Sequence, residues 1–436
     1  MSSYKVLTAS LLLSLNISTL HAIKFETLGY KSISMGGASV ASSSGSLAAY
    51  NNPALLGDTP YSVEISMGAG ASEYDHGALA PIKALQDLGF TDTLDNLPKD
   101  LDNASQDDLN TLLDGSDIIL NMNGNAVTLA PQAYIGAQIS GFGFGLFSST
   151  DATAVAVVPK GKDQLIVEDT KSTVTGYTKI EDDGSLTRDV YNINDYNNNS
   201  IIAAVENGDV NLNVTGYALA EIPIAYGYNF ETKIGNIMVG GALKYMQAIT
   251  YTDTLKIDDS GETSGSDLKK NKTSSNFGID LGLAYQPAFS YDLTFGLVAK
   301  NLNSPEFDFV DNSNLTVDPL VRAGVAYQIF DSLEIAADID LTSNKVLLDA
   351  VESQMIGGGI NYEPFTDIFA LSLRAGVMQN LHSGDKAGLI YTAGLGIGVK
   401  WFQIDLSGEM SGNSNSVENV SVPQYAKVNL ALVSRW

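Results

Sequence analysis

Residues 333–341 read LEIAADIDL, and the pattern of this stretch decides the fold class. Its odd-numbered positions are all apolar, whereas acidic residues such as Glu334 and Asp338 occupy even-numbered ones. Successive side chains of a β-strand point to opposite faces, so the stretch predicts a strand with one apolar face and one polar face. Residues 277–285 and 402–409 alternate in the same way.

This period of two recurs from residue 61 to the end of the sequence and gives about fourteen predicted strands. They cover residues 61–74, 126–140, 142–157, 212–230, 234–256, 273–287, 290–303, 319–330, 332–342, 353–363, 367–380, 388–399, 401–410 and 424–436. The expected fold class is therefore all-β.

The connections between these strands are alternately long and short. Long segments such as 158–211 and 411–423 alternate with tight turns such as those at Gly141 and 231–233. In an up-and-down barrel every long loop then lies at one end, which is the asymmetry of outer-membrane barrels. A soluble β-sandwich has no reason to sort its loops in this way. We predict an antiparallel transmembrane β-barrel of about fourteen strands in the outer membrane of a Gram-negative bacterium.

The first 22 residues have the features of a cleaved secretory signal peptide. A weakly basic start precedes the apolar run Val6–Leu15, and small residues follow up to Ala22. A buried N-terminal helix is the alternative interpretation. Export agrees with a barrel in the outer membrane, and so does the absence of Cys from the 436 residues. That absence excludes disulfides, thiolate metal sites and cysteine nucleophiles.

The formal net charge of −26 restricts the partners of the protein. Nucleic acid is excluded as a partner because phosphate binding needs clustered Lys and Arg. The acidic residues either keep exposed loops hydrated or contact divalent cations and lipopolysaccharide at the cell surface. Outer-membrane lipids and lipopolysaccharide are the partners that a barrel of this kind would meet.

Two long connections have features of their own. Apolar residues have helical spacing in 105–113, with Ser105 as the expected N-cap and Asp108 three residues later. Residues 158–211 are rich in Asn and Asp and are expected to form a surface loop.

Residues 23–57 are rich in Gly, Ala and Ser and do not alternate like a strand. They contain Met35-Gly36-Gly37-Ala38 and Tyr50-Asn51-Asn52-Pro53-Ala54. Small residues suit a segment that packs closely against other backbone, and the Asn-Pro step favours a turn.

These two motifs resemble the opening of FadL-type outer-membrane transporters, although Leu55 stands where a Gly is commoner in that family. Four later segments are similar to the TraF-like branch of the same superfamily, often labelled conjugal-transfer TraF. They are Leu297–Leu302, Arg322–Tyr327, Asp338–Thr342 and Leu373–Gly376. The resemblance spans nearly the whole sequence after residue 22.

The resemblance implies three parts: a signal peptide (1–22), an N-terminal hatch that plugs the barrel (23–57) and the barrel itself (58–436). It places Gly36, Gly37, Asn52, Pro53 and Ala54 in the hatch. It further implies uptake of a hydrophobic ligand, such as a long-chain fatty acid or a hydrocarbon, through the lumen and sideways through the wall. A TraF-like structural barrel that serves conjugation or secretion machinery, without transport, is the alternative.

The polar faces of the strands would line the lumen, where charges of both signs would pair and stiffen a plugged barrel. The expected lumen residues are Glu221, Lys244, Asp280, Lys300, Glu334, Asp338, Asp340, Arg374, Lys400, Asp405, Glu409, Lys427 and Arg435. Pro223 interrupts a predicted strand and would remove one ladder hydrogen bond, either as a local break of functional use or as an irregularity without function.

No enzyme, metal or cofactor site is predicted. Beyond residue 22 the only histidines are His76 and His382, and neither lies beside a ligand cluster. His382 and Ser383 are neighbours, but neighbours on a strand point to opposite faces and form no hydrolase dyad.

Overall fold

The computed structural model of the protein describes most of the chain. The described residues are 21–22, 27–256, 271–310, 312–345, 352–364, 369–382, 386–417 and 420–436. The predicted signal peptide lies outside them except for His21–Ala22, which form the short strand β1, and so does the start of the predicted hatch, 23–26.

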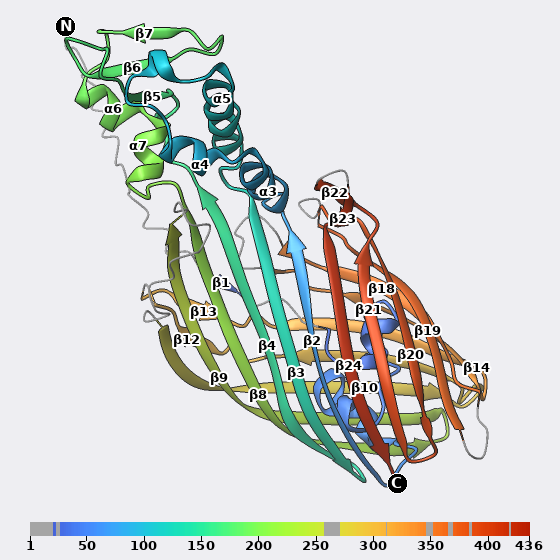
Figure 1. Ribbon diagram of the computed structural model, residues 1–436. Helices are drawn as coiled ribbons and strands as arrows, with labels where there is room; N and C mark the ends of the chain where they lie inside the picture. The colour runs from blue at the N-terminus through green and yellow to red at the C-terminus, as the bar shows by residue number, and fades with distance from the viewer. Residues whose placement is uncertain are drawn as a thin grey trace, which may run out of the picture.

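Fourteen antiparallel strands form a closed barrel, as predicted. They are β2 (Val63–Asp75), β3 (Ala126–Ile139), β4 (Phe142–Val157), β8 (Asn211–Thr232), β9 (Gly235–Lys256), β10 (Asn271–Pro287), β11 (Leu293–Lys300), β14 (Leu320–Phe330), β15 (Leu333–Asp340), β18 (Met355–Tyr362), β19 (Phe369–Asn380), β20 (Leu389–Val399), β21 (Phe402–Ser411) and β24 (Tyr425–Arg435). Every predicted strand is present, with ends displaced by at most about three residues. The last strand closes the barrel on the first, with Arg435 paired to Glu64 (Figure 1).

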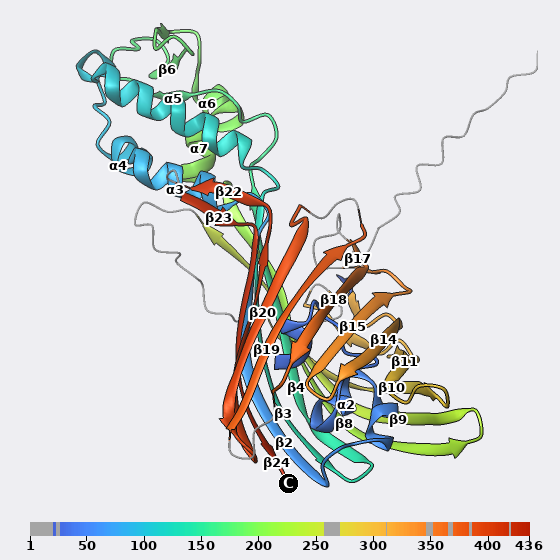
Figure 2. The same cartoon turned by 90° about the vertical axis from the view of Figure 1, so that its right-hand side faces the viewer.

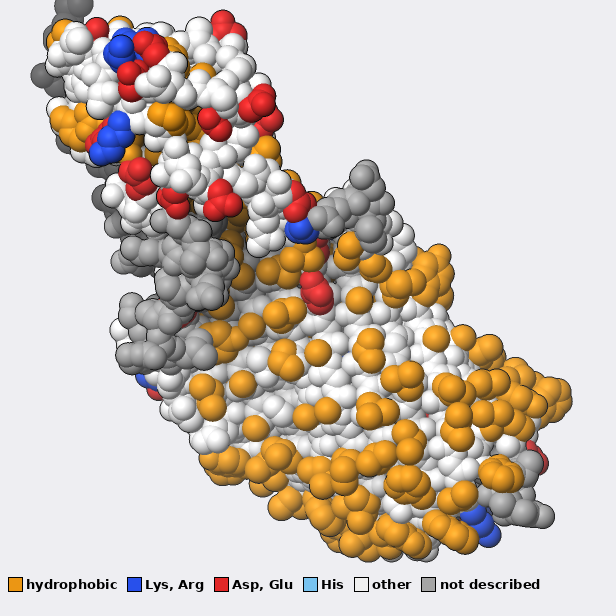
Figure 3. All heavy atoms as spheres, viewed as in Figure 1, with side chains coloured by type: hydrophobic (Ala, Val, Ile, Leu, Met, Phe, Trp, Pro, Cys, Tyr) orange, Lys and Arg blue, Asp and Glu red, His pale blue; other side chains and the backbone are white. Residues whose placement is uncertain are grey.

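The outer face of the barrel is apolar and the inner face is polar. In β8, Ile222, Ile224 and Tyr226 are exposed on the outside, whereas Glu221 and Ala225, at the alternate positions, are buried inside. Figure 3 shows hydrophobic side chains spread over the visible wall and most charged ones gathered on the loops at one end. This alternation is typical of transmembrane barrels. Among the described residues, no helix is long and apolar enough to span a bilayer.

The long connections after β2 and β4 fold together into one compact unit, which we call the loop domain (residues 76–125 and 158–210). Its elements are α3 (Leu79–Leu88), α4 (Phe90–Asp95), the 3-10 helix η3 (Leu101–Asn103), α5 (Gln106–Asn121), β5 (Ile166–Glu168), β6 (Tyr177–Ile180), β7 (Leu186–Arg188), α6 (Ile193–Asn199) and α7 (Ile201–Glu206). It projects beyond the barrel end (Figure 1).

The loop domain confirms one prediction and corrects another. The helix expected near 105–113 is α5, and Ser105 and Asp108 form a capping box at its start. Residues 158–211 are not an irregular surface loop: they contribute a small sheet, two helices and part of an apolar core. The Asn-rich composition misled because Asn192 and Ser200 act as helix caps, while the apolar Ile201–Val205 is buried.

Residues 27–57, which we call the hatch, lie inside the barrel in the half nearer to the short turns (Figure 2). They form α1 (Tyr30–Ser34), the 3-10 helix η1 (Gly45–Leu47), α2 (Ala48–Asn51) and the 3-10 helix η2 (Pro53–Gly57). The predicted N-terminal plug is therefore part of the fold.

Small hairpins lie in three other connections at the loop end. They are β12 (Glu306–Asp308) with β13 (Asn314–Thr316), β16 (Asn344–Lys345) with β17 (Glu352–Ser353), and β22 (Ser414–Val417) with β23 (Val420–Pro423). β1 pairs in parallel with β13.

Candidate functional site

The hatch rests on a set of wall glycines, which we call the glycine girdle. A Cβ atom added to Gly240 would lie 2.3 Å from the carbonyl carbon of Pro53, and one added to Gly282 would lie 2.0 Å from Asn52 Oδ1. The hatch therefore occupies space that side chains would otherwise fill. The glycine girdle consists of Gly136, Gly143, Gly227, Gly240, Gly282, Gly296, Gly357, Gly359, Gly376 and Gly394.

Asn52, Pro53 and Ala54 form a tight turn at the centre of this contact. Asn52 Oδ1 accepts a hydrogen bond from Ala54 N at 3.1 Å, and Asn52 Nδ2 donates to the Val40 carbonyl at 2.7 Å. Pro53 is the first residue of η2, a position at which a backbone N–H has no hydrogen-bond partner within the helix, so proline fits there without loss. The motif thus ties two parts of the hatch together while it contacts the wall.

Gly36 and Gly37 form the turn that follows α1. Their φ angles of 64° and 82° lie in the left-handed region that favours glycine. Gly36 N donates to Thr392 Oγ1 of β20 at 3.0 Å, so this turn is bonded to the wall as well as packed against it.

Carboxylates of β15 also bind the hatch. Asp338 Oδ2 accepts hydrogen bonds from Ser39 N at 2.7 Å and Val40 N at 2.9 Å. Glu334 pairs with Lys31 of the hatch at 2.6 Å. These two predicted lumen residues therefore act as anchors of the hatch and do not merely pair with other wall charges.

Glu64 is a third anchor, which the sequence reasoning missed. Its Oε1 accepts from Ser46 N at 2.9 Å and its Oε2 from Arg435 Nε at 3.0 Å. The alternation of β2 places Glu64 on the inner face, so its orientation could be predicted from the sequence, but its partner in the hatch could not.

Several of the other predicted lumen residues pair within the wall, whereas Lys300 and Lys427 contact the hatch: Lys300 Nζ lies 3.4 Å from the ring centre of Tyr50, and Lys427 Nζ donates to the Thr27 carbonyl at 2.9 Å. Arg374 Nη1 lies 2.5 Å from Asp405 Oδ1, and Arg322 Nε lies 2.5 Å from Asp340 Oδ1. Glu409 Oε2 accepts from a tyrosine hydroxyl at 2.6 Å. A ladder of paired charges of this kind stiffens the wall and leaves few unpaired charges in the lumen.

The hydrogen-bonded ladder is interrupted on both sides of β4. Among the described residues, no pair joins 145–146 to the opposing part of β8, which contains Pro223. The ladder between β3 and β4 is likewise interrupted at 150–151, opposite Pro131. Proline has no N–H to donate, which accounts for both gaps.

The gap at Pro223 is limited to one side of its strand. β8 continues through this residue, which is in register with Lys244 of β9. Lys244 Nζ in turn lies 3.2 Å from Glu221 and 3.1 Å from Asp280. These ion pairs hold β8 to β9 and β10, so only its contact with β4 is weakened.

A stack of aromatic rings lies behind the two gaps. Phe147 of β4 is buried on the inner face, with Tyr50 of the hatch 4.9 Å away and Tyr134 of β3 6.2 Å away between ring centroids. Gly145, next to the Pro223 gap, has no side chain that would fill the space beside Phe147. The hatch therefore reaches the weakened part of the wall through Tyr50.

An apolar cluster lies closer to the loop end, on the inner faces of β8 and β9. It includes Tyr217, Leu219 and Met246 of the wall, covered by Phe307 and Phe309 of the β12–β13 hairpin. All five side chains are buried. The hairpin thus packs an apolar core against the inner wall near the loop end.

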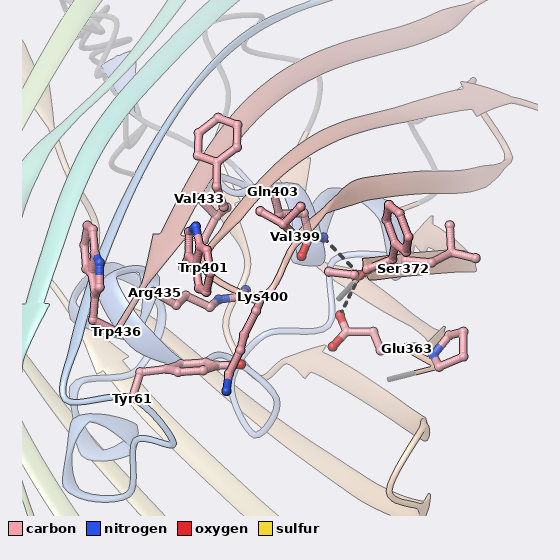
Figure 4. Close-up of a pocket in the computed structure, with 15 residues that line it drawn as sticks. Tyr61, Glu363, Ser372, Val399, Lys400, Trp401, Gln403, Val433, Arg435 and Trp436 are labelled. Carbon is pink, nitrogen blue, oxygen red and sulfur yellow. Dashed lines mark hydrogen bonds between the residues drawn. The ribbon is translucent and has the colours of Figure 1, made fainter. Parts of the chain in front are cut away.

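A cavity of about 620 Å³ lies at the turn end, among the ends of β19 and β24 and the turn between β20 and β21 (Figure 4). Lys400 in that turn is exposed to solvent, so the prediction that it faces the lumen is wrong. The prediction extended the inward–outward alternation of side chains one residue beyond the end of β20, but Lys400 lies in a tight turn, where side chains do not alternate between two faces.

Metal-binding clusters are not found in the described part of the chain. No cluster of three His, Asp or Glu that could hold a metal occurs there. His382 Nε2 lies 3.1 Å from Glu352, and Ser383 is outside the described residues.

The gap at Pro131 and the glycine girdle escaped the sequence reasoning. Pro131 lies inside the predicted strand 126–140, and a proline in a strand interior is the same signal that identified Pro223. The glycines alternate with apolar residues in the sequence, but which of them contact the hatch depends on the three-dimensional path of residues 27–57.

The fold is similar to that of solved channels. The first, described as "TodX deltaS2S3 mutant monoaromatic hydrocarbon channel", has a TM-score of 0.51 and 12% identity, over 94% of this chain and 99% of that one. The Pseudomonas putida toluene transporter TodX matches with a TM-score of 0.49 and 14% identity, over 95% and 98%. The Ralstonia pickettii toluene transporter TbuX matches with 0.49 and 13%, over 94% and 99%. The likeness to the first is one of fold.

No curated protein matches this chain. The family described as "F plasmid transfer operon, TraF, protein" matches residues 49–340, about two thirds of the sequence, and the predicted TraF-like branch is thereby confirmed. The match begins in α2 of the hatch and ends in β15. The chain therefore belongs to the TraF family of F plasmid transfer operon proteins.

Proposed function

We propose that the protein is an outer-membrane channel for the uptake of hydrophobic small molecules, such as long-chain fatty acids or hydrocarbons. Its fold is similar to that of a protein described as a monoaromatic hydrocarbon channel. The apolar outer face and the sorting of long loops and short turns support a position in the outer membrane, with the loop domain outside the cell.

The observation that carries the proposal is that the axis of the barrel is closed while its wall is weakened. The hatch is packed on the glycine girdle and bonded to Asp338 and Glu64, so an axial route would require many contacts to break together. The ladders on both sides of β4 already lack bonds at Pro131 and Pro223. A hydrophobic cargo would leave sideways without exposing its apolar surface to water, because the hydrocarbon core of the bilayer lies directly outside.

The apolar cluster lies on the way to this exit. Leu219 of the cluster and Pro223 both face the inside of β8, about 13 Å apart along the strand. Outside the gap, Leu146 and Ile222 present apolar side chains to the lipid. A cargo would therefore meet apolar surface at both ends of this short path.

Uptake measurements test the proposal directly. The protein would be produced in a Gram-negative host that lacks its own long-chain fatty-acid channel, and the entry of labelled oleate and of labelled toluene would be followed. We expect faster entry of at least one of these compounds than in cells with an empty vector. Entry at the empty-vector rate, with the barrel folded and present in the outer membrane, would contradict the proposal and favour a structural barrel of conjugation or secretion machinery.

A further inference from the structure

Beside the Pro223 gap, two glycines leave the inner face of the wall without side chains. Gly136 of β3 is paired in register with Gly145 of β4, and the ladder from β4 to β8 is interrupted at 145–146. The alternation of both strands turns these two positions toward the inside. Whatever covers the wall from the inside at this place must therefore come from neighbouring side chains.

The ring of Phe147 covers this part of the wall. Phe147 is the next inward-facing residue of β4 after Gly145 and is only 1% exposed. A Cβ atom added to Gly145 would lie 2.9 Å from Phe147 Cε2, and one added to Gly136 would lie 3.4 Å from Phe147 Cζ. The ring thus occupies the space into which side chains of both glycines would extend, directly inside the gap.

The hatch holds the Phe147 ring through Tyr50. The two rings are stacked, with their centroids 4.9 Å apart and an angle of 23° between their planes. The Tyr50 ring also contacts Lys300 of β11, whose Nζ lies 3.4 Å from the ring centre. Stacking and cation–π contacts are favourable but individually weak. An apolar cargo that packs on Phe147 in place of Tyr50 therefore replaces the lost contact at small cost.

We propose that Phe147 is the gate of the lateral exit and that Tyr50 is the latch that keeps this gate closed. Both roles presuppose the proposed transport through the gap. With its ring over Gly136 and Gly145, the gate is closed in the structure. A cargo displaces Tyr50 from Phe147, the Phe147 ring turns away from the two glycines, and the cargo passes between β4 and β8 into the lipid. Only side chains move in this step, so the hatch backbone stays on the glycine girdle.

Uptake of labelled toluene in the host described above tests the gate. We expect Phe147→Ala to accelerate uptake several-fold, because truncation of a buried apolar side chain leaves a cavity that can hold a molecule the size of benzene. Phe144→Ala is the matched control and should leave uptake unchanged, since Phe144 lies on the same strand but faces outward and is 44% exposed.

A second variant tests the latch and does not alter the wall. Tyr50→Leu should accelerate uptake less than Phe147→Ala does. It should add nothing to Phe147→Ala in the double variant, because the latch acts only through the gate. If Phe147→Ala does not fold, Tyr50→Leu decides alone, and uptake no faster than that of the wild type would overturn the proposal.

Failure of the gate and failure of the transport give different results. Wild-type uptake above the empty-vector rate that Phe147→Ala leaves unchanged or lowers would overturn the gate alone and make Phe147 a packing residue. An equal acceleration by Phe144→Ala, or an additive effect in the double variant, would also overturn it. Uptake at the empty-vector rate in the wild type and in every variant would contradict the transport itself, and the gate with it.

Discussion

Gly240 and Gly241 are adjacent in β9 but meet different surroundings. A Cβ atom on Gly240 would collide with Pro53 of the hatch, whereas one on Gly241 would find Leu281 at an ordinary contact distance of 3.5 Å. We expect Gly240→Ala to destabilise the barrel by about 1–3 kcal/mol, because the hatch must move away from the wall. Gly241→Ala is the control and should change stability little. Urea unfolding in detergent measures both, and an equally stable Gly240→Ala variant would contradict the close seating of the hatch.

Asp169 acts at the residue scale in the loop domain. Burial raises the pKa of this carboxyl, but hydrogen bonds from Arg188 Nε at 2.7 Å and Thr178 Oγ1 at 2.8 Å, among others, outweigh it, so its pKa lies below the ordinary value. A lowered folded pKa contributes stability that is present above the unfolded pKa of about 3.9 and is lost as pH falls through the folded value.

The loop domain should therefore become sensitive to acid protease as pH falls below about 4. Asp169→Asn should make the loop domain sensitive already at neutral pH, measured with a protease active there, so that its proteolysis depends less on pH. Asp107→Asn, at an exposed position of α5, is the matched control and should retain the wild-type profile. Identical profiles for wild type and Asp169→Asn would contradict this role.

At the scale of elements, the ladder of β4 is interrupted toward both of its neighbours. Pro131→Val and Pro223→Val together would restore one N–H donor on each flanking strand. We expect the double variant to be more stable by about 1 kcal/mol per restored bond and to take up hydrophobic cargo several-fold more slowly. Pro287→Val, at the end of β10, is the control and should leave uptake unchanged. Unimpaired uptake in the double variant would exclude the gaps as the exit.

The strands could be predicted from the sequence because burial of one face imposes a period of two that each segment carries by itself. The interior of the loop domain could not, since its core joins 76–125 to 158–210 and no local pattern records that contact. The same reason applies to the site. Asp338 was predicted to face the lumen, but its bond to Val40 depends on how two segments about 300 residues apart meet.

On the scale of the whole molecule, the barrel has three regions. The hatch closes its turn end, the ladder gaps beside β4 weaken its wall, and the loop domain lies at its loop end. The central claim is that cargo leaves through the wall while the hatch stays in place. The absence of Cys allows engineered disulfides to test the two routes separately.

Disulfide staples compare these routes most directly. Leu146→Cys with Ile222→Cys joins β4 to β8 across the Pro223 gap, at two outward positions between the flanking pairs Phe144–Ile224 and Phe147–Glu221. Phe142→Cys with Tyr226→Cys joins the same strands where they are already paired. Ser46→Cys with Gly136→Cys fixes the hatch to β3, where the two Cβ atoms would be 3.2 Å apart, close to the separation in a disulfide.

Uptake of labelled oleate and toluene by the three oxidised variants, each compared with its reduced form, is the decisive measurement. The account predicts that the staple across the gap stops uptake and that reduction restores it, whereas the control staple and the hatch staple leave uptake unchanged. Uptake that stops with the hatch staple and continues with the gap staple would contradict the lateral route and show that cargo passes along the axis of the barrel.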